Sequence, residues 1–415
     1  MSTDPRSMDR MDSLDVLRGF AILGILVMNI QAFSMVAQAY INPTIAGSMA
    51  GLDFWLWAIA HVGFEGKFLG LFAALFGAGL VVMAERSEAR GVNLWRRHRR
   101  RMGLLGLIGL IHAYGIWYGD ILFIYAVIGL IAFLFRRASI RRLLTFAAVF
   151  YLVPVVVALV MTGLFFTMPA SEYQAVVQAH WQPPAEAVSA QQAAYRSGWL
   201  GQMAQRIPDA ATMHLMALPL QEGWRVLALM LAGMAALKAG LLSGDWPVRR
   251  YARVGLLALF AGLPLVSAGV AFNQATGWEM KTSLYLGRLF NHFGAPLITL
   301  SWVCGVLIIL KRGHWTPLLA RLRAVGRMAL SAYLLTSVLC VTVFYGHGLG
   351  LYGQADRLDQ WIVVVAVWAV LLVTAPAWLH RFYVGPMEWL WRWGVQGQRP
   401  PWRRPPPSAA PTIAD

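Results

Sequence analysis

Residues 143–167 read LLTFAAVFYLVPVVVALVMTGLFFT and contain no charged side chain. A helix needs about 20 mostly apolar residues to cross a bilayer, so this stretch predicts a membrane span. The rest of the 415-residue chain has the same character, because 58% of the residues are hydrophobic and 13% are charged, against roughly 25% charged in a soluble domain. The mean hydropathy is +0.57. We therefore predict an all-α, polytopic membrane protein.

Ten stretches are apolar enough for a span and predict a transmembrane bundle of about ten helices. They are residues 14–36, 54–84, 102–119, 120–135, 143–167, 219–242, 252–272, 286–310, 325–346 and 359–380. The second is too long for one straight crossing and is interrupted by Gly63, Glu65, Gly66 and Lys67, so we expect its first part to be interfacial or broken. The third and fourth are short, which predicts a tight hairpin around residues 117–120.

The basic residues predict the orientation of the bundle. The formal net charge is +16, from 35 Lys and Arg against 19 Asp and Glu. Cytoplasmic loops retain Lys and Arg, and most of these residues fall on one side when the N-terminus is placed inside. Both termini are therefore expected to be cytoplasmic. The runs at 96–101 and 136–142 are topology signals rather than a nucleic-acid site.

The long external segment divides the chain. Residues 168–218 are polar and contain several prolines, and they either link two halves or form a lid. The first half is the five-helix segment 14–167 and the second is 219–393. Residues 1–13 form a cytoplasmic N-terminus, and the Pro- and Arg-rich tail 394–415 is expected to be disordered.

Motifs for several other chemistries are missing or out of context. Residues 348–353 spell G-x-G-x-x-G, but the dinucleotide fingerprint needs a preceding strand and a following helix, whereas this match follows a membrane span. The sequence has no P-loop, G-x-S-x-G or H-E-x-x-H motif. Cys304 and Cys340 lie in apolar runs and supply no ligand set for zinc or an iron–sulfur cluster. We expect neither a metal nor a nucleic-acid partner.

Polar side chains inside a bilayer are costly and are therefore functional candidates. Asp15 and Arg18 share a helix face at the cytoplasmic mouth of the first span, where they form a local ion pair or Arg18 binds a phosphate. Asn29 lies about 16 Å deeper and is either an interhelical hydrogen-bonding residue or a substrate ligand. Arg327 opens the ninth span and Glu388 follows the tenth, so both are expected to meet Arg18 on one membrane face.

A histidine marks the third span. His112 is a candidate general base, because its ordinary pKa lies near neutral pH. The alternative is a hydrogen bond to a neighbouring helix. Asp120 can orient His112 only if the helix breaks at Gly115 or Gly119. Otherwise Asp120 lies about 12 Å away along the axis and caps the next helix.

A second cluster precedes the main part of the second span. His61 and Glu65 share a helix face at spacing i, i+4, whereas Lys67 points elsewhere and is expected to pair with a residue of another helix. The three residues form either a proton relay or an interfacial ion pair.

Five motifs occur in order along nearly the whole chain. They are LDVLRGFAILGI at 14–25 ending at Asn29, KF and LFGAG within 67–79, IH at 111–112 with GDIL at 119–122, GRMAL at 326–330, and GP at 385–386 with EWLWR at 388–392. Together they resemble the YeiB-like family of bacterial inner-membrane proteins, which carries a domain of unknown function numbered 418. The resemblance implies a multi-pass protein of the bacterial inner (cytoplasmic) membrane.

The first half of that family is similar to the transmembrane acyltransferases, which include the heparan-glucosaminide acetyltransferase and enzymes that acylate periplasmic glucans. The resemblance implies their fold, a cytosolic acyl-CoA as co-substrate, and a small-molecule or glycan acceptor across the membrane. Their D-x-x-R-G opening and following Asn carry over to Asp15, Arg18, Gly19 and Asn29. The heparan enzyme's catalytic histidine lies soon after that Asn, but this chain has no His between Asn29 and His61. The role therefore passes to His112 or His61.

The leading hypothesis is an acyl-CoA-dependent acyltransferase. The CoA phosphates are expected to bind at the cytoplasmic cluster of Asp15, Arg18, Arg327 and Glu388. The catalytic group is expected to be His112 as base, Asp120 as the residue that orients it, and Asn29 as oxyanion donor.

Two other classes remain open. In a proton-coupled transporter or flippase, His61, Glu65 and Lys67 form the relay and no covalent chemistry occurs. In a scaffold or sensor, the buried polar groups serve only packing. The Gly-rich helix faces also permit a homodimer in the bilayer.

Overall fold

Helices form nearly all of the regular structure. The computed structural model describes residues 5–88 and 93–404. Within these ranges the one strand-like feature is an isolated antiparallel bridge between Phe382 and Arg403. The elements in chain order are α1 (Pro5–Ser34), η1 (Ala37–Tyr40), α2 (Gly51–Gly63), α3 (Lys67–Glu88), α4 (Leu94–Gly115), α5 (Leu122–Ala132), η2 (Phe133–Phe135), α6 (Ile140–Thr167), α7 (Ala170–His180), α8 (Ala185–Arg196), α9 (Met203–Thr212), η3 (Met213–Glu222), α10 (Gly223–Lys238), α11 (Val248–Ala275), α12 (Met280–Thr282), η4 (Ser283–Gly287), α13 (Arg288–Arg312), α14 (Thr316–Arg327), α15 (Ala329–Phe344), α16 (Arg357–Arg381) and α17 (Pro386–Gln396).

Several of these helices are long and apolar enough to cross a membrane. In the described part of the chain there are seven, or eight if the bent pair α14 and α15 forms one span. All ten stretches predicted as spans contain helix, but two do not reach this standard. α4 begins with a run of arginines, and α5 has 11 residues. The structure is thus an all-helical, multi-pass membrane bundle.

Both predicted irregularities are present. α2 ends at Gly63 and α3 begins at Lys67. Between them Gly66 has φ of +75°, a left-handed conformation that favours glycine. α4 ends at Gly115 and α5 begins only at Leu122, which confirms the predicted hairpin. Each break leaves a carboxylate, Glu65 or Asp120, in a non-helical segment inside the bundle.

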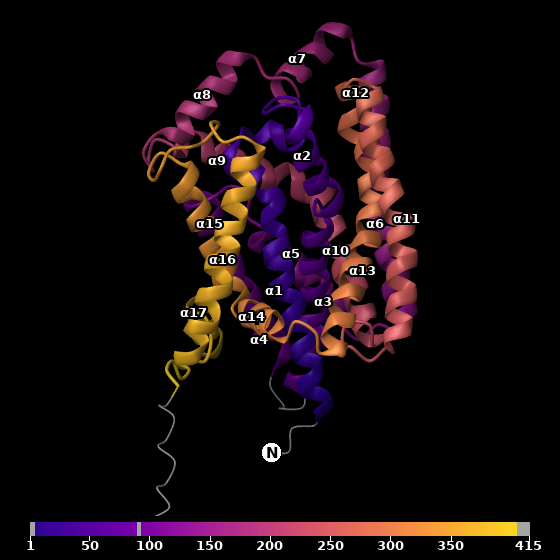
Figure 1. Cartoon of the computed structure of the whole chain (residues 1–415), viewed down its shortest axis with the longest axis vertical. Helices are drawn as coiled ribbons and strands as arrows, with labels where there is room; N and C mark the ends of the chain where they lie inside the picture. Colours follow the sequence, from indigo (N-terminus) through magenta and orange to yellow (C-terminus); the bar gives the residue numbers. More distant parts are fainter. Residues whose placement is uncertain (1–4, 89–92, 405–415) are drawn as a thin grey trace, which may run out of the picture.

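α1 forms the centre of the bundle (Figure 1), and 83% of its most apolar part is buried, against 22% for α6 at the periphery. Its crossing with α14 is unusually close. A Cβ atom on Gly19 would lie 1.9 Å from the carbonyl oxygen of Leu322, and one on Gly326 would lie 1.8 Å from that of Asp15. Small residues allow such close helix packing. This crossing accounts for the glycines of both the D-x-x-R-G and the G-R-M-A-L motifs.

The segments 14–167 and 219–393, predicted as halves, interleave within one bundle. α1 packs on α14, and α3 and α6 both pack on α10. At the α3–α10 contact, a Cβ on Gly77 would lie 2.0 Å from the carbonyl oxygen of Met230. The sites described below therefore draw residues from both segments.

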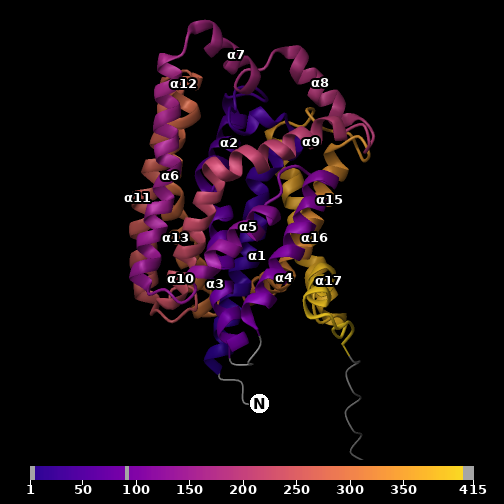
Figure 2. The same cartoon turned by 180° about the vertical axis from the view of Figure 1, so that it is seen from behind.

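The two ends of the bundle differ in structure. The start of α1, the start of α4, α14 and α17 lie at one end, called here the basic end (Figure 1). The segment 168–218 forms α7, α8, α9 and the first part of η3, and it extends across the other end (Figure 2). α8 is attached there by hydrogen bonds from the Gly346 amide to the Tyr195 carbonyl (3.0 Å) and from Arg196 Nε to the Tyr352 carbonyl (2.7 Å).

The expected disorder of the tail is wrong for residues 394–404. α17 continues to Gln396, and the chain then returns so that Trp402 packs on Phe382 and Trp389, with ring centroids 4.9 Å apart in each pair. Burial of these aromatic rings offsets the entropy cost of ordering a Pro-rich segment. Residues 405–415 lie outside the described residues.

Candidate functional site

Arginines from five helices surround a cavity of 510 Å³ at the basic end. We call this the basic cavity. Its cationic lining consists of Arg18, Arg86, Arg97, Arg101, Arg327 and Arg392. Glu388 is the one carboxylate that lines it among the residues that the structure describes. Such an excess of one sign of charge in a concave site attracts polyanions. The structure thus places the predicted Arg18, Arg327 and Glu388 at the wall of one cavity.

The arginines raise the local positive potential. Arg101 lies near the charges of Arg97, Arg392 and Arg18. Burial and the charge of Arg327 lower the pKa of Arg392, and Glu388 partly offsets this effect. An added anion would relieve this repulsion between like charges.

Arg18 is held in place by its neighbour in the first span. Its Nη1 donates to Asp15 Oδ1 over 2.7 Å, and its side chain is 24% exposed. Asp15 does not line the basic cavity. We predicted that Asp15 belongs to the ligand-binding cluster, but in the structure it instead holds Arg18 in position. Arg18 can form this ion pair and still bind a phosphate, so the two interpretations of Arg18 are compatible.

Glu388 serves as a cap for α15. The helix begins after a bend of 90° between α14 and α15, which leaves its first amide groups without intrahelical partners. Glu388 Oε1 accepts hydrogen bonds from the Leu330 amide (2.7 Å) and the Ser331 amide (3.1 Å), and Oε2 accepts one from the Ser331 hydroxyl (2.5 Å). Both oxygens of Glu388 therefore have protein donors, and direct binding of a cofactor by Glu388 stays a prediction.

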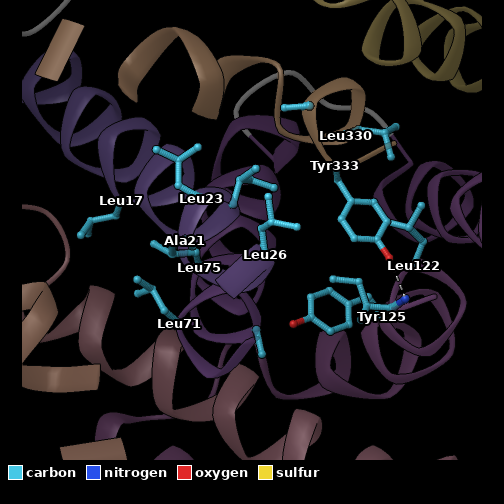
Figure 3. Packing of buried hydrophobic residues seen from close by; sticks show 14 of the residues in the cluster. Leu17, Ala21, Leu23, Leu26, Leu71, Leu75, Leu122, Tyr125, Leu330 and Tyr333 are labelled. Carbon is cyan, nitrogen blue, oxygen red and sulfur yellow. Dashed lines mark hydrogen bonds between the residues drawn. The ribbon is translucent and has the colours of Figure 1, made fainter. Parts of the chain in front are cut away.

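Two tyrosines lie at the deep end of the basic cavity. Tyr333 of α15 and Tyr125 of α5 lie beside Leu122, and all three line the cavity (Figure 3). The Tyr333 hydroxyl accepts a hydrogen bond from the Ile121 amide over 3.4 Å, and the Tyr125 hydroxyl donates to the Leu69 carbonyl over 3.0 Å.

His112 and Asp120 form a buried pair directly behind these tyrosines. His112 Nδ1 lies 2.9 Å from Asp120 Oδ1, and the His112 ring lies 5.1 Å from the Tyr333 ring. The contact is possible because α4 ends at Gly115, which is the condition set by the sequence. Asp120 Oδ2 also accepts the Phe123 amide over 2.7 Å, so Asp120 both orients His112 and caps α5.

The second nitrogen of His112 has no partner among the described residues. Nε2 is buried without a hydrogen bond, although leaving such an atom unpaired costs about 1–3 kcal/mol. It is one of 13 buried side-chain atoms without a partner in the described part of the chain, and a catalytic role is one explanation for such an atom. His112 does not line a cavity itself, because Tyr333 and Trp117 stand beside its ring.

A second cavity of 320 Å³ lies beyond the tyrosines and is lined by Asn29, Trp117 and Asp120. We call this the second cavity. Tyr125 lines both cavities and so lies between them. α1 runs from one to the other, with Arg18 facing the basic cavity and Asn29 facing the second.

The predicted cluster on α2 and α3 lies at the edge of the second cavity. His61 Nδ1 pairs with Glu65 Oε2, and Glu65 lines the cavity. Lys67 donates to Asn291 Oδ1 of α13 over 2.5 Å and to the His61 carbonyl over 2.8 Å. The prediction that Lys67 pairs with another helix is confirmed. No group of three His, Cys, Asp or Glu side chains in residues 5–88 and 93–404 is arranged to hold a metal ion.

Sequence reasoning missed several residues of both cavities. Arg97 and Arg101 belong to a run interpreted as a topology signal, and Arg86 was not singled out. Only the fold reveals that the three converge. Arg225 and Arg288 line or border the second cavity, yet both lie inside predicted apolar spans. The rule that flags ionisable groups in spans would have identified them.

Comparison with known proteins identifies relatives along most of the chain. A family model described as "Protein of unknown function (DUF418)" matches residues 236–398. "Uncharacterized protein YeiB" of Escherichia coli (strain K12) is 35% identical over 393 residues, which cover 93% of this chain and 96% of the relative. "Uncharacterized protein YxaH" of Bacillus subtilis (strain 168) is 34% identical over 405 residues, which cover 92% and 94%. No solved structure matches the chain significantly.

Proposed function

The chain belongs to the YeiB-like family of bacterial membrane proteins, and we propose that it is an acyltransferase of the inner membrane that uses cytosolic acyl-CoA. The acyl group passes to an acceptor on the periplasmic or envelope side. One observation carries the proposal: the basic cavity and the second cavity approach each other at Tyr125, next to a buried His112–Asp120 pair. A donor and an acceptor that enter from opposite sides meet in such an arrangement.

In this proposal the basic end faces the cytoplasm, following the rule that cytoplasmic segments retain Lys and Arg. Ten spans place both termini on that side. α4 and α5 then act as short spans. Neighbouring helices bury most of α5, whereas α4 leaves Leu107 and Ile111 exposed. The proposed fold resembles that of the transmembrane acyltransferases.

The basic cavity takes the donor. CoA carries a 3′-phosphate and a pyrophosphate, and guanidinium groups bind phosphate oxygens through charge-assisted, often bidentate hydrogen bonds. Arg18 and Arg327 are the proposed contacts, supported by the other arginines of the cavity. The thioester would extend from them towards Tyr333 and Tyr125.

His112 supplies the base. As the acceptor oxygen or nitrogen attacks the thioester carbonyl, its proton passes to Nε2, the atom that has no partner in the described structure. Asp120 fixes the tautomer through Nδ1, and the Asn29 amide donates to the developing oxyanion. Collapse of the intermediate breaks the C–S bond, and the CoA thiolate takes the proton back from His112. A shift of the Tyr333 or Trp117 side chain admits the reacting groups to Nε2.

Binding of CoA tests the proposal directly. We expect CoA at about 100 times its dissociation constant to add about 2.7 kcal/mol to the folded state of the detergent-purified protein. 3′-Dephospho-CoA should bind more weakly, and Arg18→Ala should lose most of the effect. Arg249→Ala is the matched control, because Arg249 is exposed and lies outside both cavities. Equal thermal unfolding with and without CoA and its acyl thioesters would contradict the proposal.

A proton-coupled transporter or flippase is the second candidate, and one observation favours it. His61, Glu65, Lys67 and Asn291 form a continuous polar chain at the edge of the second cavity. Intramembrane chains of this kind carry protons in transporters. Glu65→Gln would then abolish proton uptake by proteoliposomes, and CoA would have no effect on any variant.

A further inference from the structure

Two arginines face the second cavity with donors to spare. Arg225 donates through Nη2 to Glu222 Oε2 over 2.7 Å. Arg288 Nη2 lies 4.0 Å from Glu65 Oε1, beyond hydrogen-bonding distance, and Glu65 already has His61 as its close partner. A guanidinium carries five N–H donors, so most of those on Arg225 and Arg288 remain available to a ligand.

Both arginines are positioned by π-helical turns. The π-helix η3 ends at Glu222, three residues before Arg225, and the π-helix η4 ends at Gly287, directly before Arg288. π-Helical segments are rare because their hydrogen-bond geometry is poor, and they often occur at functional sites. Two of them, from segments distant in sequence, direct a cation to the same cavity.

The rest of the second cavity is mainly apolar. Its wall includes Leu69, Ile121, Ile124, Val226 and Leu229. A volume of 320 Å³ falls within the range of small-ligand sites. On the outer side of η3, Leu215 and Met216 are 69% and 58% exposed, as expected of a helix in contact with lipid. The cavity therefore offers two arginines with spare donors, beside the carboxylates of Glu65, Asp120 and Glu222, in a mainly apolar chamber.

We infer that the second cavity binds an anionic amphiphile, whose phosphate or carboxylate group lies between Arg225 and Arg288 and whose apolar part packs on Ile124 and Leu229. This inference rests on the proposed function in one respect: it assigns the amphiphile as the acyl acceptor. Its hydroxyl or amine would then point towards Asp120 and Tyr125, which line the same cavity. The lipid bilayer, rather than the aqueous phase, would supply the acceptor.

The test compares three probes in a neutral maltoside detergent. Dodecyl phosphate carries the anion and the chain, octaethylene glycol monododecyl ether carries the chain alone, and inorganic phosphate carries the anion alone. We expect only dodecyl phosphate to raise the thermal unfolding midpoint of the wild type at matched concentration. Equal protection by the uncharged ether, or by inorganic phosphate, would overturn the inference.

Variants assign that binding to the second cavity. Arg288→Gln should weaken dodecyl phosphate binding about tenfold or more, because at least one charge-assisted hydrogen bond is lost. Arg288 has no carboxylate within hydrogen-bonding distance, so the variant is expected to fold, and Arg225→Gln provides a second test. Arg18→Gln and Arg249→Gln should bind as the wild type does. Loss in Arg18→Gln with retention in Arg288→Gln would place the amphiphile in the basic cavity and overturn the inference.

CoA binding by the same variants separates this inference from the proposed function. If Arg288→Gln keeps CoA binding and loses dodecyl phosphate binding, both stand. If CoA binds and dodecyl phosphate does not, the donor site stands and the amphiphile site is wrong. If dodecyl phosphate binds at Arg288 and CoA binds nowhere, the amphiphile site stands and the acyltransferase proposal fails.

Discussion

The two cavities use arginine in opposite ways. In the basic cavity, six arginines face one carboxylate, and that carboxylate is occupied by the start of α15. In the second cavity, Arg225 and Arg288 lie beside three carboxylates, those of Glu65, Asp120 and Glu222, so no excess of positive charge remains. The first arrangement suits a ligand with several negative charges, whereas the second suits a single charged group on an apolar body.

The position of the cavities along α1 explains why their arginines differ in charge balance. The basic cavity adjoins the charged end of the bundle, where arginine side chains extend to water. The second lies among apolar helices, where an unpaired charge is costly and each arginine needs a nearby acid. One helix thus connects a site suited to a polar donor with a site suited to a lipid-like acceptor.

The largest effect should come from His112, which pairs with Asp120 beside the cavities. His112→Gln is expected to reduce acyl transfer in proteoliposomes at least 100-fold, since general base catalysis typically contributes 10²–10⁴. Binding of CoA and of dodecyl phosphate should persist, because His112 lines neither cavity.

A second buried histidine on α4 supplies the matched control for that experiment. His98 bonds the Gly129 carbonyl over 3.1 Å and stacks on Phe133, away from Asp120. His98→Gln should affect stability and leave the transfer rate per folded molecule unchanged. Full transfer by His112→Gln would remove the base from the proposed reaction.

The next effect concerns the crossing that builds one wall of the basic cavity. Gly326→Ala places a methyl group against the Asp15 carbonyl, and overpacking of this kind costs about 1–3 kcal/mol. Unfolding stability and CoA affinity should fall together, whereas dodecyl phosphate affinity should change little. Gly163→Ala on the peripheral helix α6 has open space around it and should be neutral or slightly stabilising. Equal stability of the two variants would mean that α1 and α14 lie further apart than described.

Ionic strength should separate the cavities without any mutation. Raising salt from about 0.1 M to about 1 M shortens the Debye length from about 10 Å to about 3 Å. CoA affinity, which depends on a cluster of arginines near water that outnumber the carboxylates beside them, is expected to fall about tenfold. Dodecyl phosphate affinity should change several-fold less, because its site is buried and nearly neutral. Titrations of the two ligands at both salt concentrations check this. Equal salt sensitivity of the two affinities would contradict the proposed difference in charge between the cavities.

The sequence predicted features that depend on local chemistry. The apolar runs predicted the helices, and residues 63–67 predicted the break in the second span. The glycines after His112 predicted the hairpin that brings Asp120 back to His112. Lys67 was expected to pair across helices because its spacing excluded His61 and Glu65. Each of these inferences uses residues within about one or two helical turns.

Features that depend on distant segments were not predictable in this way. Arg86 and Arg97 converge with Arg392 only because α3, α4 and α17 meet at one end of the bundle. Glu388 appeared to be a ligand residue because nothing local indicates that α15 starts after a bend and needs a cap. The order of residues 397–404 depends on aromatic contacts of Trp402 with helices earlier in the chain.

The smallest expected effect tests whether Glu388 caps α15 or binds the donor. Burial raises the pKa of Glu388, and hydrogen bonds from Ser331 and Leu330 partly offset this rise. Because the folded state then holds the proton more tightly than the unfolded state, protonation adds stability below the ordinary glutamate pKa. This contribution is lost as pH rises through the raised pKa.

Glu388→Gln keeps an acceptor oxygen and removes the titration, so its stability should lie within about 1 kcal/mol of the wild type and vary less with pH. Denaturant unfolding at several pH values measures both quantities. Glu388→Ala, which uncaps α15, should cost about 1 kcal/mol more. A Glu388→Gln protein with unchanged stability but no CoA binding would show that the carboxylate contacts the donor. Glu388 would then be a ligand-binding residue of the basic cavity rather than only a cap of α15.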